Sequence, residues 1–207
     1  MTYNRGPLPL RVVVLASGTG TLLHSLIQLL DPENVAIVAV GADKECPAIA
    51  KATDAGLPTF VVPFDDAARA DRAGWNRRLL AAVRDHAPDV VVSAGFMRIL
   101  GEEFVAAYAD RIINTHPALL PSFPGAHAVE DALAHGVKVT GTTVHIVDNG
   151  VDTGPILAQH AVPVADDDDR DSLHEKIKQV ERRLLADVLT TIATRGYTRD
   201  GRKAKLQ

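Results

Sequence analysis

The residues VVVLASGTGTLL, at positions 12–23, predict a buried strand, a glycine-containing turn and the start of a helix in direct succession. The apolar run VVVLA is typical of a strand that is covered on both faces, as the strands of parallel sheets are. The turn Ser17-Gly18-Thr19-Gly20 then opens into a helical pattern. Strand, turn and helix in this order indicate the first part of a βαβ unit.

The same alternation continues through the first half of the chain. Further apolar, β-branched runs lie at 35–40, 59–62 and 89–94, and helical patterns lie at about 20–31, 46–55 and 72–87. Extended patterns near 137–147 and 155–164 precede a long amphipathic helix from about 171 to 195. The predicted fold class is therefore α/β: a three-layer, open, mostly parallel twisted sheet with a Rossmann-like N-terminal half.

Length and composition favour one domain over residues 1–207. Of the 207 residues, 46% are apolar, which is enough for one sizeable core, and no stretch rich in Gly, Pro or Ser divides the chain. We expect one half at about 9–110, another at about 111–197 and a tail at 198–207, in which the basic segment from Arg199 to Lys205 is frayed. A net charge of −4 and a pI of about 6.0 do not favour a nucleic-acid surface.

Cysteine and histidine usage argues against disulfides and metal ligation. Cys46 is the only cysteine, which excludes an intrachain disulfide and favours a reducing, cytoplasmic compartment. No spacing among the histidines is typical of a zinc site, so we expect no metal. The apolar run at 10–16 is too short to span a membrane. Monomer and homodimer both remain open.

The glycine turn SGTGTL, at 17–22, is a candidate phosphate site. Backbone N–H groups at a helix N-terminus attract anions, glycine lets the chain approach a phosphate closely, and Thr21 adds a hydroxyl. The turn lacks the third glycine of a dinucleotide fingerprint and the Gly-Lys-Ser/Thr of a Walker loop, which favours a phosphate monoester over NAD or ATP. A tight turn without a ligand is the alternative.

The segment INTHPALLPSFP, at 113–124, carries candidate catalytic residues. It continues an apolar strand start, so Asn114 and His116 point to one face, with roughly 7 Å between their Cα atoms. Pro117 and Pro121 stiffen the loop that follows. An ordinary strand end with solvated polar residues is the alternative.

A turn-rich acidic segment, DNGVDTGP, occupies positions 148–155 after the strand pattern GTTVHIV. Turn chemistry alone is one explanation of its two carboxylates. If this loop faces Asn114 and His116, the carboxylate of Asp152 favours the protonated imidazole and fixes its orientation, as general acid or electrostatic catalysis requires.

Four motifs together resemble those of the folate-dependent formyltransferase family. They are SGTG at 17–20, AGFMRIL at 94–100, NTHPALLPSFPG at 114–125 and VDTGPI at 151–156. The stretch LLPSFPGAHAVEDAL, at 119–133, is most similar to members that act in purine synthesis. The resemblance implies the formyltransferase fold. It also implies transfer of a formyl group from the co-substrate 10-formyltetrahydrofolate to the amine of 5-phospho-ribosylglycinamide.

The resemblance further implies roles for the matching positions. Asn114, His116 and Asp152 match the catalytic residues, with Asn114 and protonated His116 as donors to a tetrahedral oxyanion. The ribonucleotide site falls on Gly20, Thr21, Leu22, Lys178 and Glu181, and many relatives carry Asn in place of Leu22. The folate site falls on Arg72, Met97, Arg98, Ile99, Leu100, Asn114, Asp148, Asn149, Gly150, Val151 and Asp152. Within that site, Arg98 is a cation for the anionic folate tail.

Other functions would use the same residues. A formyltetrahydrofolate hydrolase or a methionyl-tRNA formyltransferase would share the three catalytic positions, but those relatives usually carry an extra domain, for which this chain has no room. A non-catalytic folate- or phosphate-binding protein is an alternative from another class. Intact Asn114, His116 and Asp152 argue against it, because binding alone needs no preorganised oxyanion site.

Overall fold

Strand β2 (Leu10–Ala16) lies at the centre of the N-terminal unit of the computed structural model, which describes residues 2–3 and 8–207. This unit comprises residues 8–113, and a second unit comprises residues 2–3 and 114–207. The buried valines of β2 confirm that the strand is covered on both faces. Strand β6 (Ile112–His116) crosses the boundary, because Asn114 is the first residue of the second unit in that strand.

The N-terminal unit contains the predicted parallel sheet. β2 pairs in parallel with β3 (Val35–Ala42) on one side and with β5 (Val90–Ser93) on the other, and β3 pairs with β4 (Thr59–Val61). All these strands therefore end at the same edge of the sheet, where ligands bind in open α/β folds.

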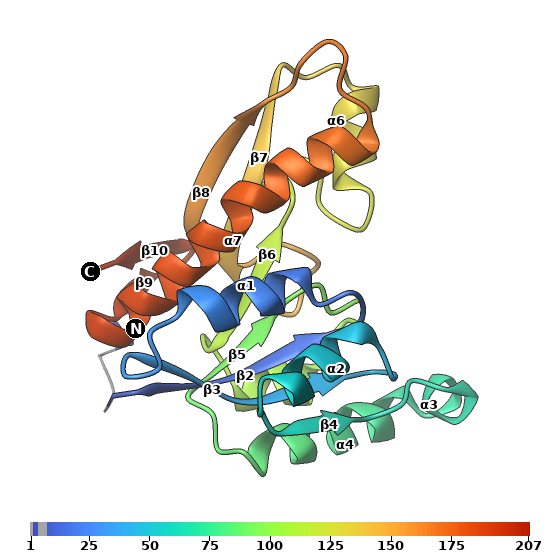
Figure 1. Ribbon diagram of the computed structural model, residues 1–207, viewed down its shortest axis with the longest axis vertical. Coiled ribbons are helices and arrows are strands. Elements are labelled where there is room, and N and C mark those ends of the chain that lie inside the picture. Colours follow the sequence, from blue (N-terminus) through green and yellow to red (C-terminus); the bar gives the residue numbers. More distant parts are fainter. Residues whose placement is uncertain (1, 4–7) are drawn as a thin grey trace. The chain divides into compact units, whose positions relative to one another are not determined.

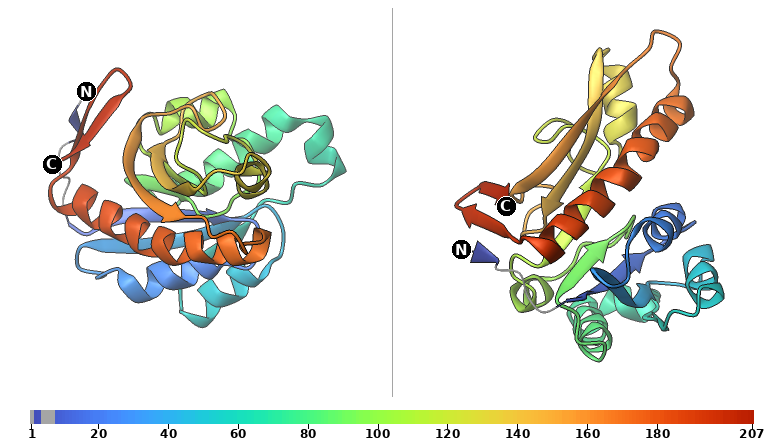
Figure 2. Two further views of the ribbon diagram at one scale, coloured as in Figure 1. Left: turned by 90° about the horizontal axis from the view of Figure 1, so that it is seen from above. Right: turned by 60° about the vertical axis from the view of Figure 1, so that its left-hand side comes forward.

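Helices cover both faces of this parallel sheet. α1 (Thr21–Leu29) and α2 (Pro47–Asp54) lie on one face, and α4 (Arg72–Arg84) and α5 (Glu102–Ala107) lie on the other (Figures 1 and 2). A short helix, α3 (Asp66–Ala70), precedes α4. The predicted α/β class with a mostly parallel sheet is confirmed, and α3 and α5 are additions to the prediction.

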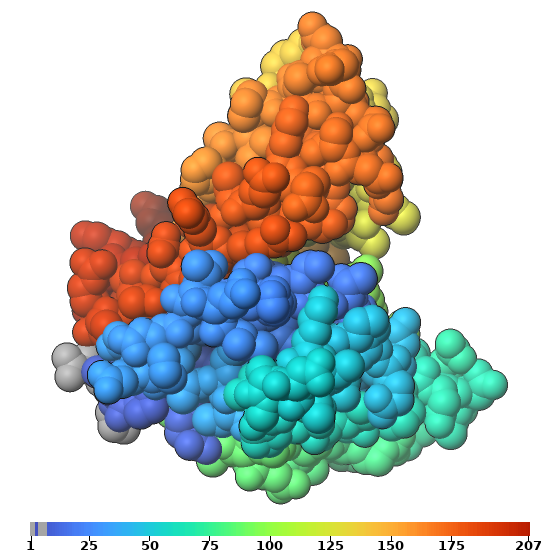
Figure 3. All heavy atoms as spheres, viewed as in Figure 1, coloured from blue at the N-terminus to red at the C-terminus, as the bar shows by residue number. Residues whose placement is uncertain are grey.

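The C-terminal unit is built on an antiparallel pair of strands. β7 (Val139–Ile146) pairs with β8 (Ile156–Pro163), and the long helix α7 (Arg170–Thr194) packs against both. Its core includes Val129 on α6 (Ala128–Ala134) and Val162 on β8, together with Leu173 and Ile177 on α7. In the space-filling view, the orange atoms of β8 and α7 form one continuous surface (Figure 3).

The end of the chain differs from the prediction. The residues expected to fray form β9 (Tyr197–Asp200) and β10 (Lys203–Leu206), which pair as an antiparallel hairpin. β1 (Thr2–Tyr3) adds to β9, and the rings of Tyr3 and Tyr197 stack at 5.4 Å between centroids. The expectation of a frayed tail was wrong, because strands distant in sequence supply partners for this segment. None of the helices within residues 2–3 and 8–207 is long and apolar enough to cross a bilayer.

Candidate active site

Strand β6 presents the two polar residues that the sequence singled out. Ile112 and Ile113 are fully buried and hold the strand in place. Asn114 and His116 follow on one face, as the alternation of side chains requires. His116 is 4% exposed, so its ring is placed by packing and by hydrogen bonds rather than by water.

Both ring nitrogens of His116 face an acceptor. Nδ1 lies 3.3 Å from Oδ2 of Asp152, and Nε2 lies 2.7 Å from the carbonyl oxygen of Phe123. The same carboxylate oxygen of Asp152 accepts the backbone N–H of Gly125 at 2.8 Å. The loop after β6 and the loop after β7 are therefore joined around one imidazole, and Asp152 does face His116.

The backbone has positive φ at the two residues that hold this imidazole. Phe123 has φ of 52° and Asp152 has φ of 53°. Asp adopts this left-handed region more readily than most L residues, whereas for Phe123 it costs about 1–3 kcal/mol and persists only where the surroundings impose it. Because Phe123 contacts His116, this strain indicates that the ring position is imposed by the fold.

His145 on β7 is a fourth member of this network that the sequence did not predict. Its Nδ1 lies 3.0 Å from the carbonyl oxygen of Ile146, which fixes that nitrogen as the donor in the neutral ring. Its Nε2 then accepts from Nδ2 of Asn114 at 3.1 Å and lies 3.5 Å from Oδ1 of Asp152. A lone histidine inside the otherwise apolar and Thr-rich strand GTTVHIV was the available signal.

Burial and the neighbouring polar groups act in opposite directions on the pKa values of His116 and Asp152. Burial lowers the pKa of His116 by more than the nearby Asp152 carboxylate and the Phe123 carbonyl raise it. Burial also raises the pKa of Asp152, but the nearby His145 ring, the N–H of Gly125 and the His116 ring lower it by more. The acceptors at both ring nitrogens favour the imidazolium that the sequence led us to expect, whereas desolvation of the ring opposes it.

Buried hydrogen bonds anchor the loop between His116 and Phe123. The hydroxyl of Thr143 donates to the carbonyl of Ala118 at 2.7 Å and accepts the N–H of Leu120 at 3.0 Å. The amide of Gln159 donates to the carbonyl of Leu120 and to the same hydroxyl. This part of the loop is fixed to β7 and β8, in agreement with a rim that holds reacting groups still.

The loop at 148–152 is shaped by its first carboxylate. Oδ1 of Asp148 accepts the N–H of Gly150 at 3.0 Å and the hydroxyl of Thr153 at 2.6 Å. The turn leaves Val151 half exposed and places the half-buried carboxylate of Asp152 against the histidines. Asn149 lies exposed in the same turn.

Of the two predicted residues of α7, Glu181 contacts β6. Glu181 forms a hydrogen bond with the side chain of Thr115, the residue between Asn114 and His116. Because neighbouring side chains of a strand point to opposite faces, this contact lies on the other side of β6 from the imidazole. Burial raises the pKa of Glu181 by more than Thr115 and the nearby Lys178 lower it.

In the N-terminal unit, the turn after β2 has the features of an anion site. Gly20 precedes α1 with φ of 67°, and no side chain caps the helix. Thr21 is exposed as the first residue of α1, while the side chain of Leu22 is buried, so only the backbone of Leu22 can serve a ligand. A Cβ at Gly20 would lie 2.7 Å from Cα of Ala48, which explains why the turn uses glycine.

The predicted folate loop of the N-terminal unit is exposed on its apolar side. Met97 is 63% and Ile99 is 62% exposed, and Leu100 is half-buried. Nε of Arg98 donates to Oδ2 of the buried Asp43 at 2.7 Å, so this cation already has a carboxylate partner.

The side chain of Arg72, the first residue of α4, is bound to the backbone of the loop at 97–100, the predicted folate loop. Its Nη2 donates to the carbonyl of Ile99 at 3.1 Å. Phe64 lies beneath both cations, with its ring centroid 5.5 Å from Cζ of Arg72 and 4.6 Å from Cζ of Arg98. The side chains of Arg72 and Arg98 therefore both hold the loop at 97–100 in place.

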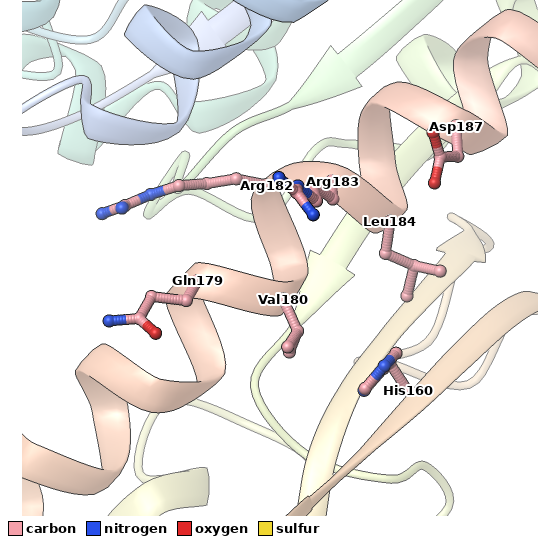
Figure 4. A pocket seen from close by; sticks show the side chains of 7 residues that line it. All are labelled: His160, Gln179, Val180, Arg182, Arg183, Leu184 and Asp187. Atoms are coloured by element: carbon pink, nitrogen blue, oxygen red, sulfur yellow. The ribbon is translucent and has the colours of Figure 1, made fainter.

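The predicted site residues thus fall into two groups. Asn114, His116 and Asp152 form one network in the C-terminal unit, and Gly20, Thr21, Arg72 and the loop at 97–100 lie in the N-terminal unit. A separate surface pocket between β8 and α7 contains none of the predicted residues (Figure 4). It is lined by His160, Gln179, Val180, Arg182, Arg183, Leu184 and Asp187. Within residues 2–3 and 8–207, no group of three or more His, Cys, Asp or Glu side chains is arranged as metal ligands.

Comparison with known proteins identifies the family. The model of the formyl transferase family matches residues 10–189. The chain belongs to this family. It is 55% identical over 199 residues to the phosphoribosylglycinamide formyltransferase of Mycobacterium tuberculosis, a match that covers 96% of this chain and 92% of that protein.

Two solved structures give the same fold. The glycinamide ribonucleotide transformylase 1 of Symbiobacterium toebii has a TM-score of 0.88 at 34% identity, covering 95% of this chain and 93% of that one. A formyltetrahydrofolate deformylase from Pseudomonas syringae has a TM-score of 0.85 at 29% identity, covering 94% of this chain and 64% of that one. The formyltransferase fold predicted from the motifs is confirmed.

Proposed function

We propose that this chain transfers the formyl group of 10-formyltetrahydrofolate to the amine of 5-phospho-ribosylglycinamide in de novo purine (IMP) biosynthesis. The observation that carries the proposal is the partly buried network of Asn114, His116 and Asp152. It combines an amide donor, an imidazole and a carboxylate, which are the groups that formyl transfer to an amine needs. Membership of the formyl transferase family supports a folate co-substrate.

The reaction needs no covalent intermediate on the protein. The lone pair of the substrate amine forms a bond to the formyl carbon, and the carbonyl electrons move to oxygen. When the tetrahedral intermediate collapses, the bond from carbon to N10 of the folate breaks. The amine loses one proton and N10 gains one, so the protein must only stabilise the oxyanion and help to move that proton.

Asn114 is the first candidate donor to the oxyanion. Its Nδ2 carries two hydrogens, and His145 accepts one of them. The second hydrogen remains for the substrate oxygen. His145 thereby fixes the orientation of the amide before the substrate binds, which lowers the cost of reorganisation in the transition state.

His116 is the second candidate donor. A ring N–H of His116 would donate to the substrate oxygen as negative charge develops there, and that charge raises the pKa of the imidazole. To reach that oxygen, Nε2 must exchange the Phe123 carbonyl for the substrate. The one proton that the amine loses would pass to the Asp152 carboxylate, directly or through water, and from there to N10 as the bond to the formyl carbon breaks.

The ribonucleotide would be held through its phosphate by the turn at Gly20, Thr21 and Leu22. Backbone N–H groups at the uncapped start of α1 and the hydroxyl of Thr21 are the donors. Lys178 and Glu181 on α7 would bind the glycinamide end.

The folate would use the exposed apolar loop at 97–100 and the turn at 148–152. We assign the anionic tail to Arg72 rather than to Arg98, because Arg98 already has the carboxylate of Asp43 as its partner. We further propose a cytoplasmic enzyme without a metal or a nucleic-acid partner, as a monomer or a homodimer.

The test is deformylation of the folate, followed by absorbance, with and without 5-phospho-ribosylglycinamide. Turnover that requires the amine supports the transferase. Turnover that ignores the amine favours the hydrolase, to which the similarity with the Pseudomonas syringae deformylase also points. Tight folate binding without turnover favours a non-catalytic binding protein.

A further inference from the structure

Ser17 joins two loops of the N-terminal unit that are distant in sequence. It directly follows β2, and β2 lies beside β5 in the parallel sheet (Figure 1). Its hydroxyl accepts the backbone N–H of Met97 at 2.9 Å, and its own N–H donates to the carbonyl of Gly95 at 3.3 Å. Ser17 is 7% exposed, so water does not compete freely for these bonds.

The turn that begins at Ser17 is fixed on its other side by α2. The N–H of Ala48 donates to the carbonyl of Gly18 at 3.1 Å, and Nζ of Lys51 donates to the carbonyl of Thr19 at 2.7 Å. These bonds hold the carbonyl groups of the turn against α2. Ser17 is the point at which this rigid turn is attached to the loop after β5.

The loop after β5 is likewise fixed through its backbone. Besides the bond to Ser17, the carbonyl oxygen of Ile99 in this loop accepts a hydrogen bond from Nη2 of Arg72 at 3.1 Å. Its last N–H, that of Gly101, donates to the side chain of Asn76 at 2.7 Å. Arg72 and Asn76 both belong to α4, so Ser17 supplies the bond from the side of the phosphate turn.

We propose that Ser17 is a positioning residue that couples the binding of the two substrates. The inference rests on the proposed function, in which the turn binds the phosphate of the amine substrate and the loop at 97–100 binds the folate. A phosphate that binds the turn would further restrict the motion of Ser17 and, through its hydrogen bond, that of the N–H of Met97. The second substrate then meets a loop that has less motion left to lose, and linkage requires the effect to be reciprocal.

The experiment measures this coupling without turnover. The dissociation constant of tetrahydrofolate, which lacks the formyl group, is measured with and without saturating 5-phospho-ribosylglycinamide. In the wild type we expect tetrahydrofolate to bind about fivefold more tightly with the ribonucleotide present, the equivalent of one net hydrogen bond. In Ser17→Ala, the ratio of the dissociation constant without the ribonucleotide to that with it falls towards one. Thr53→Val, which also removes one hydrogen-bonded hydroxyl from this unit, keeps the wild-type ratio.

A ratio of one in the wild type overturns the proposal. So does a Ser17→Ala protein that binds both ligands more weakly but keeps the wild-type ratio, because that result describes a purely structural role. Amide exchange in the wild type gives a second test that needs no variant. The ribonucleotide alone should slow exchange at the N–H of Met97, and unchanged exchange contradicts the coupling. Failure of amine-dependent formyl transfer in the wild type is a separate result that overturns the proposed function itself.

Discussion

Asn114 and His145 share a hydrogen bond of 3.1 Å between Nδ2 and Nε2, and this bond fixes which way the Asn114 amide faces. The tautomer of His145 follows from its other nitrogen, which donates to the carbonyl of Ile146. A backbone carbonyl therefore determines, through one imidazole, the orientation of an amide that we place at the reacting oxygen. The placement of hydrogens follows from the acceptors that surround the ring.

Replacement of His145 by Leu should lower kcat more than it raises either KM. The amide of Asn114 would lose its acceptor and could rotate, so a donor aimed at the transition state would be lost while substrate contacts persist. We expect a loss of about tenfold, within the range for a hydrogen bond that orients a buried group. His145→Gln, whose side-chain oxygen can accept, should retain more activity. Equal rates in the two variants would contradict this role.

Replacement of Asp152 by Asn should lower the pKa of His116 further. Asp152 is the larger of the two groups that raise this pKa against the effect of burial, so its loss leaves burial less opposed. Turnover should fall by about 10²–10³, as for the loss of other transition-state stabilising groups. An NMR titration of the imidazole measures the first effect and steady-state kinetics the second. A raised pKa, or near wild-type turnover, would show that Asp152 does not act on His116.

The stability of the folded protein should fall on mild acidification partly through His116. Its pKa in the folded state lies below the ordinary value of 6.5, so below pH 6.5 the unfolded chain binds a proton that the folded protein does not. The free energy of unfolding therefore declines as the pH falls below 6.5, until the folded ring is also protonated. Urea unfolding at about pH 7.5 and 5.5 should show a smaller decline for His116→Gln than for the wild type. An equal decline would contradict a depressed pKa.

Gly20→Ala should weaken ribonucleotide binding. The positive φ disfavours alanine, and its Cβ would lie 2.7 Å from Cα of Ala48. A left-handed alanine costs about 1–2 kcal/mol before the clash is counted, so we expect KM for the ribonucleotide to rise about tenfold or more. Gly18→Ala is the matched control, because a Cβ there meets nothing within 4 Å. Similar effects of the two substitutions would argue against this turn as the phosphate site.

The local sequence pattern was sufficient to predict much of the fold and the candidate catalytic residues of β6. The apolar run of β2 predicts a strand covered on both faces, and the alternation along β6 places Asn114 and His116 on one face. Both inferences depend on residues that are near neighbours in sequence. The glycine turn before α1 is local in the same way.

What the sequence did not predict depends on contacts between distant segments. His145 meets Asn114 from 31 residues away, and Ser17 meets Met97 from 80 residues away. The hairpin of β9 and β10 was not predicted, because its basic residues suggest a solvated tail. In the structure, β1 pairs with β9 and β8 pairs with β10. The lowered pKa of His116 was missed because burial cannot be read from the residue types around one histidine.

The central claim is that the buried imidazole of His116 assists formyl transfer to an amine. The measurement is single-turnover transfer from 10-formyltetrahydrofolate to 5-phospho-ribosylglycinamide by wild type and His116→Ala, with circular dichroism to verify folding. We predict amine-dependent transfer by the wild type and a rate lower by about 10²–10³ in the variant at unchanged folate affinity. Equal rates in the two proteins, or loss of formyl from the folate without the amine in the wild type, would contradict the account.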